Sequence, residues 1–253
     1  MNDARLLNSH RRRALQRGYS LIEVSVAMAV ALFLLGGMFT VLQSTRQNSG
    51  NQNVLAQLQD QQRIAMTIMT DVIQQAGYFP NAQTDKAADK LLPLAPFATA
   101  GQSVFGGTDA YGDFVTVRYI GDSTGDVLDC RGSPIGNGTV EEMKFHVQPL
   151  NASPNAPLTL WCSMNGNDAP LVTNVSSLTI RYGADTSVSG SVNAYLPANQ
   201  MAAYWTSVES VKLTVSFTNP LFGQPGQTNN PTISFNRVVG IMANSGVNAL
   251  VYK

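Results

Sequence analysis

The chain has few of the residues on which most catalytic and metal sites depend. Its 253 residues include 2 histidines, 2 cysteines and 13% charged residues, with a formal net charge of 0. His10 and His146 are far apart in the sequence, and the cysteines lack C-x-x-C spacing, so we expect no zinc site. There is no basic stripe to hold phosphates, so we expect no direct contact with nucleic acid.

Motifs of the common enzyme classes are also missing. The sequence contains no G-x-S-x-G turn and no phosphate-binding glycine loop. Glu141 and Glu142 resemble a carboxylate pair, but adjacent residues on a strand point to opposite faces and cannot easily share one site. His146 lies in a strand-like pattern, where a lone histidine is more often structural or solvent-facing than catalytic. We therefore expect a non-enzymatic protein without catalytic residues, metal or cofactor.

The N-terminal region is the most informative part of the sequence. The run from Val24 to Leu42 contains no charged residue and no proline. A helix of about 20 such residues matches the roughly 30 Å hydrocarbon core of a bilayer. A secretory signal peptide is the competing interpretation, but its apolar region is shorter and ends in a small-residue cleavage site, whereas Gln43-Ser44-Thr45-Arg46 follows here.

The basic residues before this run predict its orientation. Under the positive-inside rule, the N-terminus is cytoplasmic and the bulk of the chain lies on the other side of the inner membrane. The residues concerned are Arg5, Arg11, Arg12, Arg13 and Arg17.

Glu23 is the unusual residue at the edge of the apolar run. A carboxylate costs about 2.5 to 3.5 kcal/mol at the centre of a bilayer, and less near the interface, so it usually has a partner. If the chain is cut between Gly18 and Tyr19, Glu23 becomes the fifth residue, and the new α-amino group of a neighbouring subunit is a candidate counter-ion. The alternative is an ordinary signal anchor with an interfacial glutamate.

Gly18, Tyr19 and Glu23, together with the basic leader and the apolar run, resemble the N-terminus of the type IV pilin family. The resemblance implies that prepilin peptidase cuts after Gly18, that the amine of Tyr19 is N-methylated, and that Glu23 neutralises this amine during assembly. Tyr19 stands where Phe is usual, but the aromatic ring is kept, so we expect cleavage. Removing residues 1–18 lowers Lys+Arg from 16 to 11 and Asp+Glu from 16 to 15, which leaves a formal charge of −4.

After Gln43 the helical pattern becomes amphipathic. Apolar residues recur at three- and four-residue steps and form a stripe that needs a sheet to bury it. We expect the helix to end near Gly77, a suitable C′ residue, with Pro80 shortly after. The stripe consists of Leu55, Leu58, Ala65, Ile68, Met69, Val72, Ile73 and Ala76.

The remainder predicts a β-rich head. Val211 to Phe217 alternates most clearly and should lie half-buried over the helix stripe. The connections from Asn81 to Asp113 and from Asp185 to Ala203 are long for loops and predict insertions or functional surface. The expected strands are Phe114 to Ile120, Thr139 to Val147, Leu158 to Cys162, Leu171 to Val175, Leu178 to Tyr182, Val208 to Phe217 and Ile233 to Ile241.

These patterns together predict an α+β fold in which a long N-terminal transmembrane and amphipathic helix packs on an antiparallel β-sheet head, as in pilins. The expected parts are a leader peptide (1–18), a transmembrane half of the helix (19–43), an amphipathic half (44–77) and a periplasmic head (78–253).

The two cysteines, Cys130 and Cys162, both lie on the exported side, where disulfides form. Closing a loop of about 30 residues contributes roughly 3 to 4 kcal/mol in the chain-entropy model, so we predict that they are bonded. The alternative is two buried thiols.

The order of later segments is similar to PilW-type minor pilins. The segments are Met69 to Tyr78, Asp113 to Tyr119, both cysteine segments, Leu178 to Gly183 and Val208 to Lys212. This resemblance implies a role in a priming complex at or near the pilus tip. The implied partners are other minor pilins, the major pilin, prepilin peptidase and the inner-membrane assembly platform. A type II secretion pseudopilin and a ligand-binding adhesin or DNA-uptake subunit are the alternatives.

Relatives of this kind often have an acid-rich calcium loop after the Arg181-Tyr182-Gly183 segment. Here the corresponding residues, 183–193, include a single carboxylate, Asp185. Ca²⁺ requires six to eight oxygen ligands, so we expect a hydrogen-bonded turn rather than a degenerate site of Asp185, Ser187 and Asn193.

Overall fold

The computed structural model describes residues 18–153, 156–187, 189–224 and 230–243. All but the last residue of the predicted leader (1–18) lies outside the described residues. The chain divides into two compact units, Met1–Gln52 and Asn53–Lys253. The long helix α1 (Leu21–Gln74) contributes its first half to one unit and its second half to the other.

The C-terminal end of α1 is closed by a glycine in the left-handed conformation. Gly77 has a φ of +82°, which avoids the steric cost that a side chain would bring. Its N–H donates to the carbonyl oxygen of Arg118 at 2.9 Å, and the N–H of Met242 donates to the free carbonyl of Gln74 at 3.2 Å. The predicted helix end near Gly77 is confirmed.

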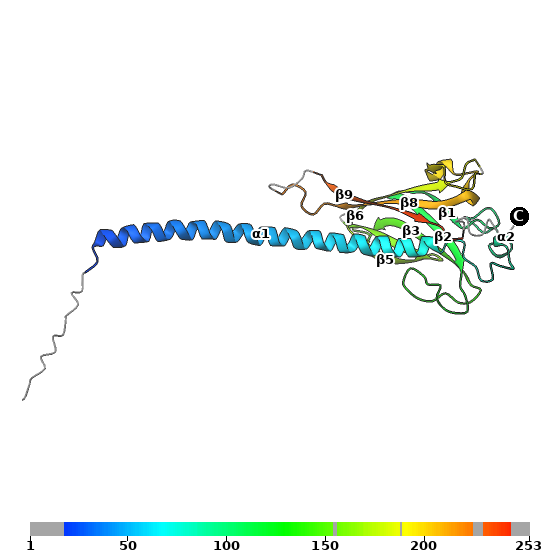
Figure 1. Cartoon of the computed structure of the whole chain (residues 1–253), viewed down its shortest axis with the longest axis horizontal. Coiled ribbons are helices and arrows are strands. Elements are labelled where there is room, and N and C mark those ends of the chain that lie inside the picture. Colours follow the sequence, from blue (N-terminus) through cyan, green and yellow to red (C-terminus); the bar gives the residue numbers. More distant parts are fainter. Residues whose placement is uncertain (1–17, 154–155, 188, 225–229, 244–253) are drawn as a thin grey trace, which may run out of the picture. The chain divides into compact units, whose positions relative to one another are not determined.

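The second half of α1 buries one stripe against the head. Its buried residues recur at helical spacing and share one hydrophobic core with the strands. Figure 1 shows this half of α1 running beside the strands of the head. Each large apolar side chain buried in this way contributes about 1.5 to 3 kcal/mol relative to exposure. The helix residues in this core are Leu58, Ala65, Met66, Met69, Val72, Ile73 and, just beyond the helix, Ala76.

The head is antiparallel, as the sequence pattern predicted, and its strands form two sheets. The five-stranded sheet has the order β1-β2-β3-β4-β5, and the four-stranded sheet has the order β7-β6-β8-β9. The first consists of β1 (Val104–Asp109), β2 (Gly112–Ile120), β3 (Val140–Pro149), β4 (Leu158–Met164) and β5 (Asn167–Thr173). The second consists of β6 (Val175–Ala184), β7 (Ala194–Leu196), β8 (Val208–Thr218) and β9 (Thr232–Gly240).

Strand β8 lies at the centre of the four-stranded sheet and confirms the predicted alternation. Val211, Leu213, Val215 and Phe217 are fully buried, whereas Lys212 is exposed. These four side chains belong to the same core as the stripe of α1. The period-two pattern therefore predicted correctly which face of β8 points into the core.

Each of the seven predicted strands overlaps an observed strand, although the predicted Leu171–Val175 runs past the end of β5 at Thr173, and β1 and β7 were missed. Both lie in the two long connections for which we expected insertions or functional surface, and no strand was predicted there. Strand β1 contains Gly106, which has no room for a Cβ against the hydroxyl of Tyr182 on β6. Strand β7 has 3 residues, too short for a periodic signal. The same connections also contain α2 (Ala87–Lys90) and the short 3-10 helix η1 (Ala198–Gln200), and η2 (Trp205–Ser207) follows.

Candidate processing and assembly site

Gly18, Tyr19 and Ser20 precede α1 and form no regular structure. The N–H groups of Glu23 and Val24 both donate to the carbonyl oxygen of Ser20, at 3.0 and 3.2 Å, so the helix begins immediately after Ser20. Tyr19 is 83% exposed. The Gly18–Tyr19 peptide bond thus lies in exposed, non-helical backbone, the kind of segment that proteases cut most readily.

Glu23 lies in the first turn of α1 and is exposed. A negative charge at this end of a helix is stabilised by the helix dipole and by the unpaired N–H groups of the first turn. Within the part of the chain that the structure describes, Glu23 has no ion-pair partner. Its carboxylate is therefore available to a positive group from another molecule.

The helix that follows Glu23 is uncovered. Its most apolar 18-residue window has a mean hydropathy of 2.3 and is 0% buried, so the segment is long and apolar enough to cross a membrane. The hydroxyls of Ser25, Thr40 and Thr45 donate to the carbonyls of Ile22, Gly36 and Val41 at 2.8 to 3.0 Å. These side chains are satisfied within the helix, as an apolar environment requires.

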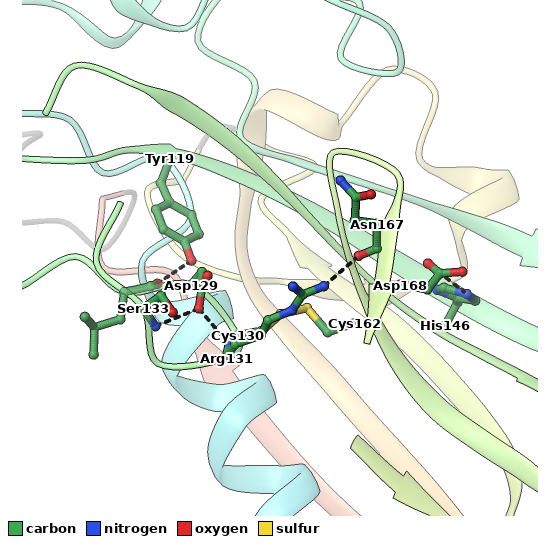
Figure 2. The surroundings of a disulfide bond; sticks show 10 residues. Tyr119, Asp129, Cys130, Arg131, Ser133, His146, Cys162, Asn167 and Asp168 are labelled. Atoms are coloured by element: carbon green, nitrogen blue, oxygen red, sulfur yellow. Dashed lines mark hydrogen bonds and ion pairs between the residues drawn. A yellow bond between two sulfur atoms is a disulfide. The ribbon is translucent and has the colours of Figure 1, made fainter. Parts of the chain in front are cut away.

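The head contains the predicted disulfide between Cys130 and Cys162. Cys130 lies in the connection from β2 to β3, Cys162 lies on β4, and their Cα atoms are 6.5 Å apart (Figure 2). Both residues are buried and belong to the main core. The bond ties a long connection to β4, an inner strand of the five-stranded sheet.

Side chains next to the disulfide fix the same connection. The carboxylate of Asp129 accepts the N–H groups of Arg131 and Ser133 at 2.7 and 2.9 Å. The Tyr119 hydroxyl donates to the carbonyl of Leu128 at 2.8 Å, and burial raises the pKa of Tyr119, so this donor stays protonated. Figure 2 shows these groups on either side of Cys130, with Arg131 reaching the carbonyl of Asn167.

The Asp185 loop is the hydrogen-bonded turn that we expected. Asp185 Oδ1 accepts the N–H of Ser187 at 3.0 Å, and Oδ2 accepts the N–H of Gly190 at 2.6 Å. Hydrogen bonds from the backbone of Ser189 and its neighbours lower the pKa of Asp185 to about 2. Asn193 Oδ1 accepts the N–H of Thr186 at 3.1 Å. The carboxylate oxygens are therefore engaged by donors of the loop itself.

The two glutamates of β3 lie on different faces, as alternation predicts. Glu141 is opposite Tyr119, whose ring is in the core, and Glu142 is opposite Arg118. His146 on the same strand is 6% exposed, with its Nε2 4.0 Å from Asp168 Oδ1. Burial lowers the pKa of His146, which favours the neutral ring.

Sequence reasoning missed the role of Arg118. It is 1% exposed, and its guanidinium donates to the carbonyls of Gln102, Leu92 and Leu91 at 2.7, 2.6 and 3.1 Å. Burial lowers its pKa. The available signal was the alternation in β2, where Phe114, Thr116 and Arg118 share the face opposite Val115 and Val117.

Two segments of the chain match models of known protein families. Residues 13–39 match the model of the prokaryotic N-terminal methylation motif, a span that includes Gly18, Tyr19 and Glu23. Residues 147–246 match the model of Type IV Pilus-assembly protein W. The chain is 26% identical over 170 residues to the "Pilin-like protein PilA3" of Thermus thermophilus, covering 66% of this chain and 67% of that protein.

A solved structure is also similar. The "Type IV-like pilin TTHA1219 from Thermus thermophilus" matches with a TM-score of 0.42 and 12% identity, covering 74% of this chain and 97% of that one.

Proposed function

We propose that this chain, which matches the prokaryotic N-terminal methylation motif and resembles pilin-like proteins, is a minor pilin of a priming or tip complex that initiates pilus assembly. The observation that carries the proposal is the start of α1. An exposed Gly18–Tyr19 bond, a glutamate, Glu23, that has no ion-pair partner among the described residues, and an uncovered apolar helix follow one another there. The role is structural rather than catalytic.

Maturation begins in the inner membrane. Prepilin peptidase removes residues 1–18 at the cytoplasmic face, and the new amino group of Tyr19 is methylated. Residues 19–43 remain in the bilayer, residues 44–77 form the amphipathic half of the helix, and the head of residues 78–253 is periplasmic.

Assembly then transfers the helix from lipid to a bundle of similar helices. In the bundle, Glu23 pairs with the Tyr19 amine of a neighbouring subunit. A charge pair is stronger in this low-dielectric surrounding than in water, so it fixes the axial register of the incoming subunit. The partners are other minor pilins, the major pilin and the inner-membrane assembly platform.

Co-purification tests the proposal. The full-length chain is purified in detergent together with each candidate minor pilin and, separately, with the major pilin. We expect a stable complex with other minor pilins, and few surface pili and no twitching motility in a strain that lacks this chain. Normal pili in the deletion strain would contradict the proposal. If secreted enzymes also accumulated in the periplasm, the chain would instead be a pseudopilin of a type II secretion system.

A further inference from the structure

The outer face of the five-stranded sheet contains a cavity of about 370 Å³. Its walls come from side chains that alternate with the buried core residues of the same strands, so this face points away from the main core. Its volume lies in the range of small-molecule sites, which begins at about 300 Å³. The residues used below are Phe105, Phe114, Thr116, Glu142, Lys144 and Ser163.

The pairing of the strands brings these residues together. Phe105 on β1 is opposite Thr116 on β2, Thr116 is opposite Lys144 on β3, and Lys144 is opposite Ser163 on β4. Four strands thus contribute one row of side chains to the cavity, at cross-strand spacings of about 5 Å. Glu142 lies two residues before Lys144 on the same face.

Glu142 carries the observation that indicates a ligand. Its Oε1 atom is buried, and in the described part of the chain it has no hydrogen-bond partner. Buried carboxylate oxygens are nearly always paired, because desolvation without a hydrogen bond is costly. Burial raises the pKa of Glu142, whereas the nearby Arg118 opposes this shift. Glu142 Oε1 is therefore an acceptor without a donor, and a hydroxyl group of a ligand can supply that donor.

The charge around the cavity is balanced. Lys144 Nζ lies 3.9 Å from Asp109 Oδ2 and 4.2 Å from the centroid of the Phe114 ring. The ammonium group is therefore already compensated, and Glu142 is opposite Arg118. This balance favours a neutral ligand over a phosphate, which requires surplus positive charge.

Two aromatic rings form an apolar wall. The centroids of Phe105 and Phe114 are 6.3 Å apart with an interplanar angle of 46°, and Phe105 also contacts Trp205 at 5.2 Å. These contacts hold the rings in place. Rigid aromatic rings beside a few polar groups suit a ligand that has one apolar face and several hydroxyls.

We propose that this cavity binds a sugar residue of a glycan. The C–H face of the sugar packs on Phe105 and Phe114, and one hydroxyl donates to Glu142 Oε1. Other hydroxyls meet the side chains of Thr116, Ser163 and Lys144. The site lies beyond the assembly role and does not depend on it.

Saturation-transfer NMR on the full-length chain tests this proposal. The detergent must have a zwitterionic head group, since a maltoside would itself compete for the site. The probes are the methyl glycosides of glucose, galactose, mannose and N-acetylglucosamine. We expect saturation transfer from the protein to at least one probe. The affinity of Glu142→Gln for that probe should be about tenfold lower than that of the wild type, since losing 1.4 kcal/mol corresponds to a factor of about ten.

Glu209→Gln is the matched control, because this glutamate lies on β8 of the four-stranded sheet and does not line the cavity, and it should bind like the wild type. Ser163→Ala is a second variant and should weaken binding with the fold intact, as checked by circular dichroism. The proposal is overturned if no probe is saturated. It is also overturned if both glutamate variants bind equally well, or if inorganic phosphate displaces the bound sugar and binds more tightly.

Discussion

The guanidinium carbon of Arg118 lies 4.5 Å from the centroid of the Phe97 ring. Arg118 is on β2, and Phe97 belongs to the connection between α2 and β1. Both side chains are buried, and the three carbonyls that Arg118 binds come from the same connection. One side chain thus fastens this connection to the sheet, and the exposed Leu92 and Leu94 project from it.

Replacing Arg118 by Met should release this connection. The variant leaves the carbonyls of Gln102 and Leu92 without this donor, whereas Leu91 keeps the N–H of Gly101. Each unsatisfied buried group costs about 1 to 3 kcal/mol, so we expect a loss of about 3 kcal/mol in the free energy of unfolding. Limited proteolysis should cut between residues 91 and 102 much faster than in the wild type. Arg181→Met, at an exposed position on β6, is the control and should behave like the wild type. Unchanged proteolysis in Arg118→Met would contradict this role.

Replacing Gly18 by Trp should block removal of the leader, because a bulky side chain next to the scissile bond does not fit a peptidase site that takes glycine. Intact-protein mass spectrometry of the membrane fraction should then detect the unprocessed chain. Gly50→Ala, in the exposed part of α1, should mature normally, because a Cβ at that position meets nothing within 4 Å. Detection of the mature mass in Gly18→Trp would refute cleavage at this bond.

Replacing Glu23 by Val should leave cleavage intact but reduce incorporation into pili. The substitution removes the charge that pairs with the neighbouring amine, and a loss of about 1.4 kcal/mol lowers incorporation about tenfold. Immunoblots of sheared pili and of membranes measure the two pools. Glu23→Asp keeps the charge and should retain more incorporation than Glu23→Val. Equal incorporation of Glu23→Val and the wild type would remove this carboxylate from assembly.

Replacing both Cys130 and Cys162 by Ala should destabilise the head by about 3 kcal/mol, since the bond closes a loop with a sequence separation of 32. Urea unfolding of the full-length chain, followed by tryptophan fluorescence, measures the change. Adding a reductant should lower the stability of the wild type and leave the double variant unchanged. If the reductant affected both proteins equally, its effect would not come from this bond.

The Asp185 turn should weaken only in strong acid. Its folded-state pKa of about 2 lies below the usual value of about 3.9, so the ionised carboxylate stabilises the fold above pH 4. This contribution is lost as the pH falls from about 4 through 2. The amide resonance of Gly190 should titrate with a midpoint near 2, because its N–H donates to Asp185 Oδ2. In Asp185→Asn the titration should disappear, and a midpoint near 4 in the wild type would contradict the hydrogen-bonded carboxylate.

Local patterns in the sequence determined several features of this protein. Hydropathy and the absence of proline predicted α1, the position of Gly77 predicted its end, and alternation predicted seven strands and the inward face of β8. These features depend on near neighbours, because helix and strand periods and the freedom of glycine at positive φ act within a few residues. The presence of 2 cysteines left one possible intrachain pairing.

Tertiary structure alone decided the division into two sheets, the strands β1 and β7, the burial of Arg118 and the cavity at Glu142. Strand β1 pairs with β2 despite its glycines, and Gly106 leaves room for the hydroxyl of Tyr182 on β6. Arg118 can be buried because its guanidinium donates hydrogen bonds to carbonyls that lie 16 to 27 residues away in the sequence. Such contacts join residues that are distant in the chain, and their free energy depends on positions that no local pattern encodes.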